Sequence, residues 1–268
     1  MRRPLVFLLV ALAAGTTVLA AQFPLFGDEV SVPVKNARYD GRFTFARVKY
    51  NSEVAQANYY YGLPPWAHGY ISRGGGTRAE EGLMRIMNDL SFLNGHVDDS
   101  VVVGLDDAQL GRYPVVYMTE EGFWTVTNRE AAGFRSYLQK GGFVIFDDFR
   151  MDGDSIPWGG GWENFADNMQ HVLPGVKFFD LDPSHPIFHS FFEIDSFDII
   201  KQPYGQGRPI FRGIYEDNDP SKRLMAVIDY NTDIANFWEF SQRGLYPVDD
   251  TNQGYKLGVN YIVYGLTH

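Results

Sequence analysis

Short apolar runs recur along the chain and predict the strands of a sheet. Residues 43–50 (FTFARVKY) alternate apolar and polar positions, which is the pattern of a strand with one covered face. Residues 101–103 and 114–118 are apolar and rich in β-branched side chains, as is typical of strands covered on both faces. Residues 143–146 and 176–179 predict two further strands. We therefore expect a series of short and mostly buried strands.

Segments with helical periodicity alternate with these strands. Thr77 and Glu80 form a capping-box pattern before an amphipathic stretch that extends to Leu93. Residues 127–139 begin with the same pattern and end at a pair of glycines. Residues 162–173 predict a third helix, which a Pro-Gly pair terminates. This order predicts an α/β fold with a doubly wound, mostly parallel sheet and flanking helices.

The last third of the chain departs from this alternation. Residues 210–215 and 224–230 predict two strands, and the turn-rich segment 216–221 between them predicts a β-hairpin. Residues 254–266 carry apolar side chains on one helical face and predict a closing helix. Residues 43–268 are therefore expected to form one α/β domain that ends in a β-hairpin plus helix.

The N-terminal residues predict export. Two arginines precede an apolar run at residues 5–14, and residues 18–20 (VLA) provide the small residues that a signal peptidase reads. We expect residues 1–20 to be a signal peptide and the product to be soluble in the periplasm or secreted. An uncleaved membrane anchor is the alternative, although the run is shorter than the about 20 apolar residues of a membrane span. Residues 21–42 predict a linker or N-terminal arm.

The composition is that of an ordinary globular chain, and it excludes several classes of chemistry. Of 268 residues, 45% are apolar and 21% are charged, and cysteine is absent, which excludes thiol nucleophiles, zinc-thiolate sites and iron-sulfur clusters. The formal charge of -10 provides no sequence-wide basic surface for a nucleic acid. No phosphate-binding loop, dinucleotide fingerprint, His-Glu-x-x-His or Gly-x-Ser-x-Gly motif occurs, so the sequence implies no cofactor and no metal.

Polar and aromatic residues follow the predicted strands at the edge where doubly wound sheets bind ligands. These strand-end residues are 119–124, 147–150 and 231–233, and the candidates for a pocket among them are Trp124, Asp147, Asp148, Asn231 and Asp233. Successive residues of a strand point to opposite faces, so we expect only one of Asp147 and Asp148 to enter a given pocket. Alternatively, both carboxylates cap the following turn and pair with Arg150. Paired carboxylates at a strand end are suited to cation binding or to acid–base chemistry.

His185 and His189 are four residues apart, a spacing that brings two metal ligands together on a helix. Pro186 lies between them and argues against a helix there. We therefore expect these histidines to make structural polar contacts, with a metal pair as the alternative.

Six ordered blocks of the sequence resemble the bacterial domain of unknown function family 4159. The blocks are residues 43–50 (FTFARVKY), 113–119 (YPVVYMT), 137–149 (YLQKGGFVIFDDF), 185–192 (HPIFHSFF), 231–234 with 238–239 (NTDI then WE) and 258–268 (GVNYIVYGLTH). The resemblance implies a flavodoxin-like fold of the class I glutamine-amidotransferase-like superfamily. It also adds Glu239 to the residues expected to share a pocket with Asp147, Asp148, His185, His189, Asn231 and Asp233.

Comparison with the enzymes of this superfamily also excludes one activity for this chain, the thiol-dependent transfer of an amide group. Its enzymes carry a cysteine nucleophile on a tight turn after a central strand, and residues 119–124 occupy the corresponding place in this chain. Those residues include no cysteine, serine or histidine, so a thiol-dependent glutamine amidotransferase is excluded.

Three hypotheses for function follow. The favoured one is a non-catalytic binding domain of the bacterial cell envelope that recognises a small polar ligand, a glycan or an envelope protein. It rests on export, the missing nucleophile and the aromatic loops, whose tryptophans either form a rim that stacks a ligand or cover the edges of the sheet: Trp66, Trp124, Trp158 and Trp162. The alternative is a hydrolase acting on carbohydrate or amide, with Asp147 or Asp148 as base or metal ligand and His185 or His189 assisting. The third is a purely structural module.

Overall fold

The computed structural model describes residues 32–52, 63–71, 78–149, 161–203 and 207–268. Within these residues, seven strands form one sheet with five helices around it, which confirms an α/β fold. The strands are β1 (Ala46–Lys49), β2 (Val101–Gly104), β3 (Val115–Thr119), β4 (Phe143–Phe149), β5 (Phe179–Asp180), β6 (Ile210–Tyr215) and β7 (Leu224–Tyr230). The helices are α1 (Ala79–Leu90), α2 (Asn128–Gln139), α3 (Trp162–Val172), α4 (Ile234–Phe240) and α5 (Val248–Thr267). The predicted signal peptide lies outside the described residues.

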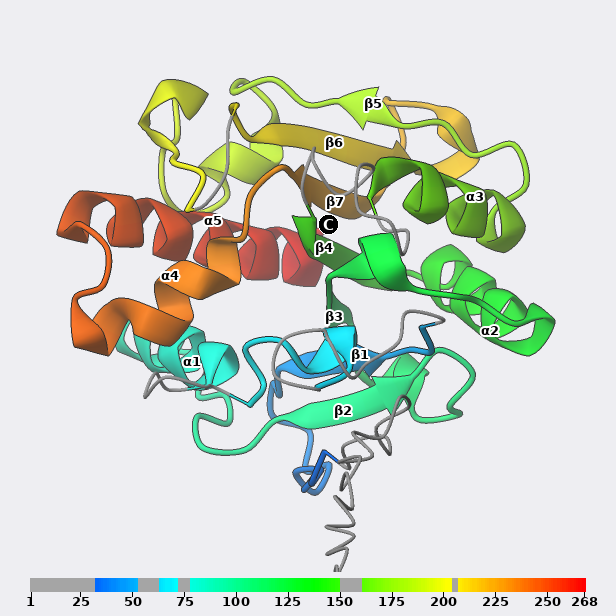
Figure 1. Ribbon diagram of the computed structural model, residues 1–268, viewed down its shortest axis with the longest axis horizontal. Helices are drawn as coiled ribbons and strands as arrows, with labels where there is room; N and C mark the ends of the chain where they lie inside the picture. Colours follow the sequence, from blue (N-terminus) through cyan, green and yellow to red (C-terminus); the bar gives the residue numbers. More distant parts are fainter. Residues whose placement is uncertain (1–31, 53–62, 72–77, 150–160, 204–206) are drawn as a thin grey trace, which may run out of the picture.

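The sheet is mostly parallel, with the strand order β2-β1-β3-β4-β7-β6-β5 (Figure 1). The first five strands of this order are parallel, whereas β6 runs antiparallel to both β7 and β5. The chain moves from β1 to β2 on one side and then returns to β3 on the other side of β1. The strand order therefore reverses between β1 and β3.

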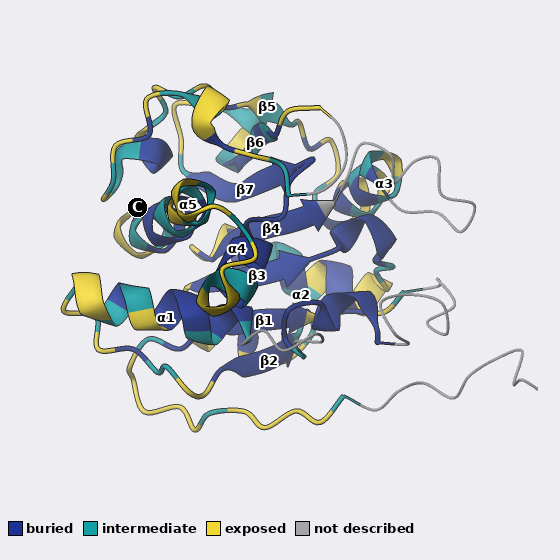
Figure 2. Cartoon of the chain, turned by 60° about the vertical axis from the view of Figure 1, so that its left-hand side comes forward, coloured by how far each residue is buried: buried dark blue, intermediate teal, exposed yellow. Residues whose placement is uncertain are grey.

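Helices cover both faces of the sheet (Figure 1). Helices α2 and α3 pack on one face around Trp124, Phe134 and Phe165, and helices α1, α4 and α5 pack on the other around Trp238 and Tyr261. The strands are mostly buried, and exposed residues lie mainly on outer helix faces and loops (Figure 2). None of the described helices combines the length and the apolar character needed to cross a membrane.

Two strands differ from those predicted from the sequence. Arg47 is fully buried, so β1 is covered on both faces near its centre, where the alternating pattern predicted one covered face. The predicted strand at residues 176–179 is instead the two-residue edge strand β5, because the side chain of Gln170 bonds to the backbone of Gly175 and Val176 and holds a turn there.

The helix boundaries also agree only in part with the sequence. Helix α2 begins with the predicted capping box, in which Thr127 and Glu130 bond reciprocally. Helix α5 begins at Val248, six residues before the predicted start, and α4 is absent from the predicted elements because seven residues are too few for a clear period. Thr77, the expected cap of α1, lies outside the described residues.

Close packing between α5 and its neighbours gives a test of the fold. A Cβ on Gly258 would lie 2.4 Å from Cζ2 of Trp238 and 3.0 Å from Cδ1 of Leu83, so Gly258→Ala forces buried side chains apart. We expect this variant to lower the free energy of unfolding by about 1–2 kcal/mol, measured by urea denaturation. Gly111→Ala is the control, because no heavy atom lies within 4 Å of its Cβ position, and its effect should stay within about 0.5 kcal/mol. Equal losses in the two variants would contradict this packing.

Candidate functional site

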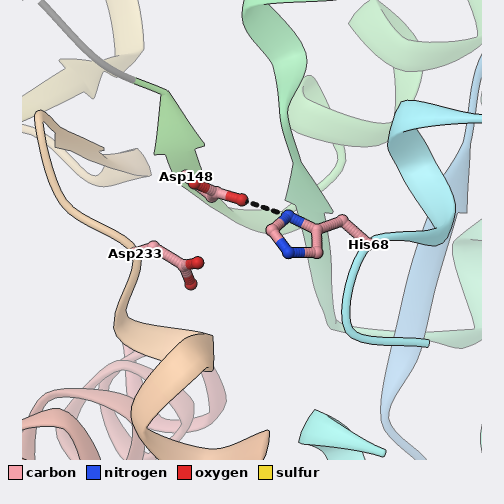
Figure 3. Close-up of side chains that lie close together, drawn as sticks. All are labelled: His68, Asp148 and Asp233. Carbon is pink, nitrogen blue, oxygen red and sulfur yellow. Dashed lines mark ion pairs between the residues drawn. The ribbon is translucent and has the colours of Figure 1, made fainter. Parts of the chain in front are cut away.

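Three buried side chains from different parts of the chain meet at the carboxyl edge of the sheet (Figure 3). His68 lies in the loop after β1, Asp148 near the end of β4, and Asp233 directly before α4. His68 Nδ1 is 2.5 Å from Asp148 Oδ2, and one ligand atom of each residue lies within 4.8 Å of the others. The three residues are 9%, 1% and 2% exposed, in that order. An imidazole and two carboxylates thus converge in a site that is largely closed to solvent.

A β-bulge sets the direction of Asp148. Strand β4 pairs with β7 through Asp147 and then through Phe149, so Asp148 is an extra residue in the ladder. Its φ is 68°, a left-handed backbone conformation that costs about 1 kcal/mol or more for a residue with a side chain. Glu120 and Asn231, which follow β3 and β7, have φ values of 54° and 60°. Backbone strain is therefore concentrated at the same edge of three adjacent strands.

Asp147 makes different contacts from those of its neighbour Asp148. Its carboxylate accepts hydrogen bonds from the backbone N–H groups of Ile234 (3.0 Å) and Ala235 (3.1 Å) and from the hydroxyl of Tyr117 (2.8 Å). Asp233 accepts a further bond from the N–H of Asn236 (2.8 Å). Two carboxylates therefore satisfy the first turn of α4, which explains how so short a helix is held in place.

Arg47 holds the loop that carries His68. Its Nη1 donates to the backbone carbonyls of Trp66 (3.2 Å) and His68 (2.7 Å), and its Nε donates to Glu80 Oε1 at 2.5 Å. The guanidinium also lies over the ring of Tyr117, 4.9 Å from its centroid. Burial has the largest single effect and lowers the pKa of Arg47, but the charge and hydrogen bond of Glu80, with the charge of Tyr117, together raise the pKa above its usual value. Arg47 therefore stays charged and fixes the loop to β1.

The charges around His68 favour its protonated form. Burial acts to lower the pKa of the imidazole, but the charge and hydrogen bond of Asp148 raise it, and Asp233 and Glu239 add to this effect. The net result is a pKa above the ordinary value for histidine. Glu120 contributes a further carboxylate oxygen 3.3 Å from His68 Nδ1. The imidazole is thus the positive centre of a ring of carboxylates.

Burial raises the pKa of other carboxyl groups near this edge. Glu121 is fully buried, neither of its carboxylate oxygens has a hydrogen-bond partner among the described residues, and burial raises its pKa well above the usual value. Burial also raises the pKa of Asp229 to about 8, although the hydroxyl of Tyr261 donates to it at 2.8 Å. The pKa of Asp147 is raised chiefly by burial and next by the charge of Asp233.

Acidic side chains outnumber basic ones in the described interior. The buried basic residues are Arg47 and His68, whereas the buried acidic residues are Glu80, Glu120, Glu121, Glu130, Asp147, Asp148, Asp229, Asp233 and Glu239. Seven of these nine carboxyl groups belong to segments that follow β3, β4 or β7 or to the ends of those strands. The edge is therefore suited to a cation or to a ligand that donates hydrogen bonds.

The structure brings only part of the predicted residue set together. Asp148 and Asp233 lie with His68, and Glu239 is buried on α4 close enough to raise the pKa of His68. Asn231 ends β7, and its side-chain amide donates to the backbone carbonyl of Arg208 at 3.1 Å.

Trp124 lies in the core rather than on a rim. Its ring stacks on Phe165 and meets Phe134 edge-on, with both centroids 6.3 Å away. The indole is fully buried under α2 and α3, so it presents no face to a ligand. Trp124 therefore packs against the sheet, as in the second of the two predicted roles, and does not form a rim that stacks a ligand.

His185 and His189 lie apart from the aspartates. His185 Nε2 contacts the hydroxyl of Tyr215 at 2.9 Å, and its ring is 6.1 Å from that of Tyr264, which packs on Phe143 at the start of β4. His185 is therefore at the amino end of β4, the opposite edge from Asp148. The expectation that it assists Asp147 or Asp148 is wrong, because α5 and β6 hold its segment at that opposite edge.

His189 has local partners instead. Its ring nitrogens contact Glu193 at 2.5 Å and the carbonyl of Pro183 at 2.7 Å. Glu193 and Asp195 complete a second group of possible ligands, but both are exposed. This group is thus a solvated cluster beside the surface, unlike the buried one around His68.

His68 is absent from the residues predicted at the strand ends, and Glu120 and Glu121 are at a predicted strand end but not among the predicted pocket residues. All three follow strands of the parallel sheet at the carboxyl edge, so the rule that selected Asp148 also applies to them. His68 carries no local signal because its loop is long and aromatic, and the two glutamates share their strand end with Trp124, the pocket residue predicted from that segment.

The buried ion pair between Arg47 and Glu80 predicts a large effect of mutation. Arg47→Met leaves a buried carboxylate without its guanidinium and releases the loop at His68, so we expect a loss of about 3–5 kcal/mol in the free energy of unfolding. The double variant with Glu80→Gln should recover part of this loss, because no charge is then left unpaired. Urea denaturation of both variants checks this, and a double variant less stable than Arg47→Met alone would contradict it.

The carboxyl of Asp229 predicts a pH dependence. Its pKa is raised from 3.8 to about 8 in the folded protein, so its contribution to stability is fully present below pH 4 and is lost as pH rises through 8. Asp229→Asn keeps an oxygen that accepts the bond from Tyr261 and removes the titration. The stability of the wild type relative to this variant should therefore fall between pH 4 and 8 in denaturation curves. A difference that is constant across this range would contradict the assignment.

Comparison with known proteins identifies the family. No curated protein matches the chain. A family model, described as a domain of unknown function (DUF4159), matches residues 44–266. This match covers most of the chain and confirms the resemblance seen in the six sequence blocks. The protein therefore belongs to the DUF4159 family.

Proposed function

We propose that this protein is an exported, non-catalytic module of the bacterial cell envelope that binds a small polar ligand at the carboxyl edge of its sheet. The observation that carries this proposal is the buried pair of His68 and Asp148, 2.5 Å apart, inside a group of carboxylates. Such a site favours a ligand with positive charge or several hydrogen-bond donors, such as an amine or a glycan.

The order of the parallel strands supports a flavodoxin-like architecture within the class I glutamine-amidotransferase-like superfamily. Counted along the chain, the five parallel strands have the order 2-1-3-4-5, which is that of flavodoxin-like sheets. Ligands of such sheets bind where the order reverses, here between β1 and β3. His68 follows β1 and Glu120 follows β3, so the group lies at this position.

The turn after β3 supports a role without a thiol nucleophile. Glu120 and Glu121 stand in the turn where the enzymes of this superfamily carry cysteine, and the chain has no cysteine. Export is supported by the signal-peptide pattern of residues 1–20.

One observation favours the hydrolase as a second candidate. The contact between Asp148 and His68 resembles the arrangement in which a carboxylate orients an imidazole for proton transfer. In this alternative His68, rather than His185 or His189, is the general base or acid for a carbohydrate or amide substrate.

A ligand screen on the full chain tests the proposal. We expect at least one compound among soluble glycans, short peptides and polyamines to raise the melting temperature of the wild type. His68→Gln should weaken that compound's binding at least 10-fold, because the central polar group is altered. His189→Gln is the matched control and should bind like the wild type. No shift with any compound, or equal binding by His68→Gln, would contradict the proposal.

The same compounds separate the two candidate functions. Incubation of a binding compound with the wild type should leave it intact if the module is non-catalytic. Hydrolysis by the wild type that is lost in both His68→Gln and Asp148→Asn would instead establish the hydrolase.

A further inference from the structure

We infer that His68, Asp148 and Asp233 bind a divalent transition-metal ion. This inference rests on the proposed binding site and names a ligand for it. One potential ligand atom from each residue lies within 4.8 Å of the other two, although the residues are far apart in the sequence. The side chains approach one another from the loop after β1, from the end of β4 and from the start of α4 (Figure 3).

Small side-chain movements bring these atoms to the distances of a metal site. Atoms bound to zinc at about 2.1 Å lie about 3.4 Å apart in a tetrahedral arrangement. The spread of 4.8 Å therefore has to shrink by at most about 1.4 Å, a change within reach of side-chain rotation. His68 Nδ1 and Asp148 Oδ2 are 2.5 Å apart and share a proton when His68 is charged, so these two atoms have to separate by about 0.9 Å to hold an ion. A cation that takes the place of this proton joins the same two atoms and releases the proton to solvent.

Two buried glutamates in the turn after β3 strengthen the inference. Glu120 Oε1 is 3.3 Å from His68 Nδ1, so a further carboxylate borders the same position. Glu121 is fully buried, and its two oxygens have no hydrogen-bond partner among the described residues. A buried carboxylate without a partner is costly in the absence of a cation or proton, which makes it an observation independent of the three ligands.

The donor set selects the kind of ion. One imidazole with carboxylates, in a chain without cysteine, offers nitrogen and oxygen donors and no thiolate. Imidazole favours zinc and its transition-metal neighbours, whereas calcium and magnesium prefer oxygen alone. Zn²⁺ and Mn²⁺ are therefore the ions to test.

The exposed group of His189, Glu193 and Asp195 provides a matched control within the same chain. It has the same donor types at similar spacing, but both of its carboxylates are exposed to solvent. Water competes with a metal at such a group and screens its charges. Metal binding that depends on His68 and not on His189 therefore identifies the buried site.

Calorimetric titration of Zn²⁺ into the EDTA-treated full chain tests the inference. We expect one ion per chain in the wild type and in His189→Gln. His68→Gln and Asp233→Asn should each bind at least 10-fold more weakly. The Asp233 variant keeps an oxygen to accept the bond from Asn236, so its fold should persist. The absence of stoichiometric binding by the wild type, or unchanged binding by both His68→Gln and Asp233→Asn, would overturn the inference.

A second measurement needs no variant of the buried residues. Substoichiometric Mn²⁺ should broaden the imidazole NMR signal of one of the six histidines first, and that signal should still be present in the spectrum of His189→Gln. If the signal broadened first is the one missing from His189→Gln, the exposed cluster binds the ion and the inference fails. A third outcome is that Zn²⁺ does not bind but a polar compound still binds in a way that depends on His68. That outcome overturns the inference of a metal ion and leaves the proposed ligand site supported.

Discussion

The buried ion pair between Arg47 and Glu80 is the contact on which the site depends. Arg47 belongs to β1, Glu80 belongs to α1, and the guanidinium also binds the backbone of the loop between them. A buried charge is costly without a partner, so strand, loop and helix have to keep one arrangement. That arrangement places His68 over the carboxyl ends of β3 and β4. The position of one imidazole thus depends on a salt bridge whose guanidinium also binds the backbone carbonyl of the same histidine.

A strained backbone at the end of β4 and hydrogen bonds to the first turn of α4 position the other two side chains of the site. The bulge at Asp148 turns one carboxylate toward His68, while Asp147 reaches the backbone of α4 and helps to hold Asp233 at the start of that helix. The three left-handed residues at this edge cost free energy, and the surrounding hydrogen bonds and packing offset it. Stability and site geometry therefore rest on the same few polar contacts, so substitutions at this edge are expected to change both.

The sequence predicted those parts of the fold that have a regular local signal. The capping box at Thr127 and the apolar runs of β3 and β4 are visible in the sequence because their energetics are local. Helix α4 escaped prediction because carboxylates distant in the sequence, above all Asp147, satisfy its first turn. Asp148 was predicted from its place at a strand end, whereas His68 required knowledge of how the loop folds back over the sheet. His185 was misplaced because its sequence pattern carries no information about which edge of the sheet it meets.

Anomalous diffraction from crystals soaked in Zn²⁺ or Mn²⁺ tests the proposed metal site, since it locates a bound ion without substitutions. We expect a peak within bonding distance of His68, Asp148 and Asp233, with Glu120 beside it. A peak confined to His189, Glu193 and Asp195, or no peak at the carboxyl edge of the sheet, would contradict it.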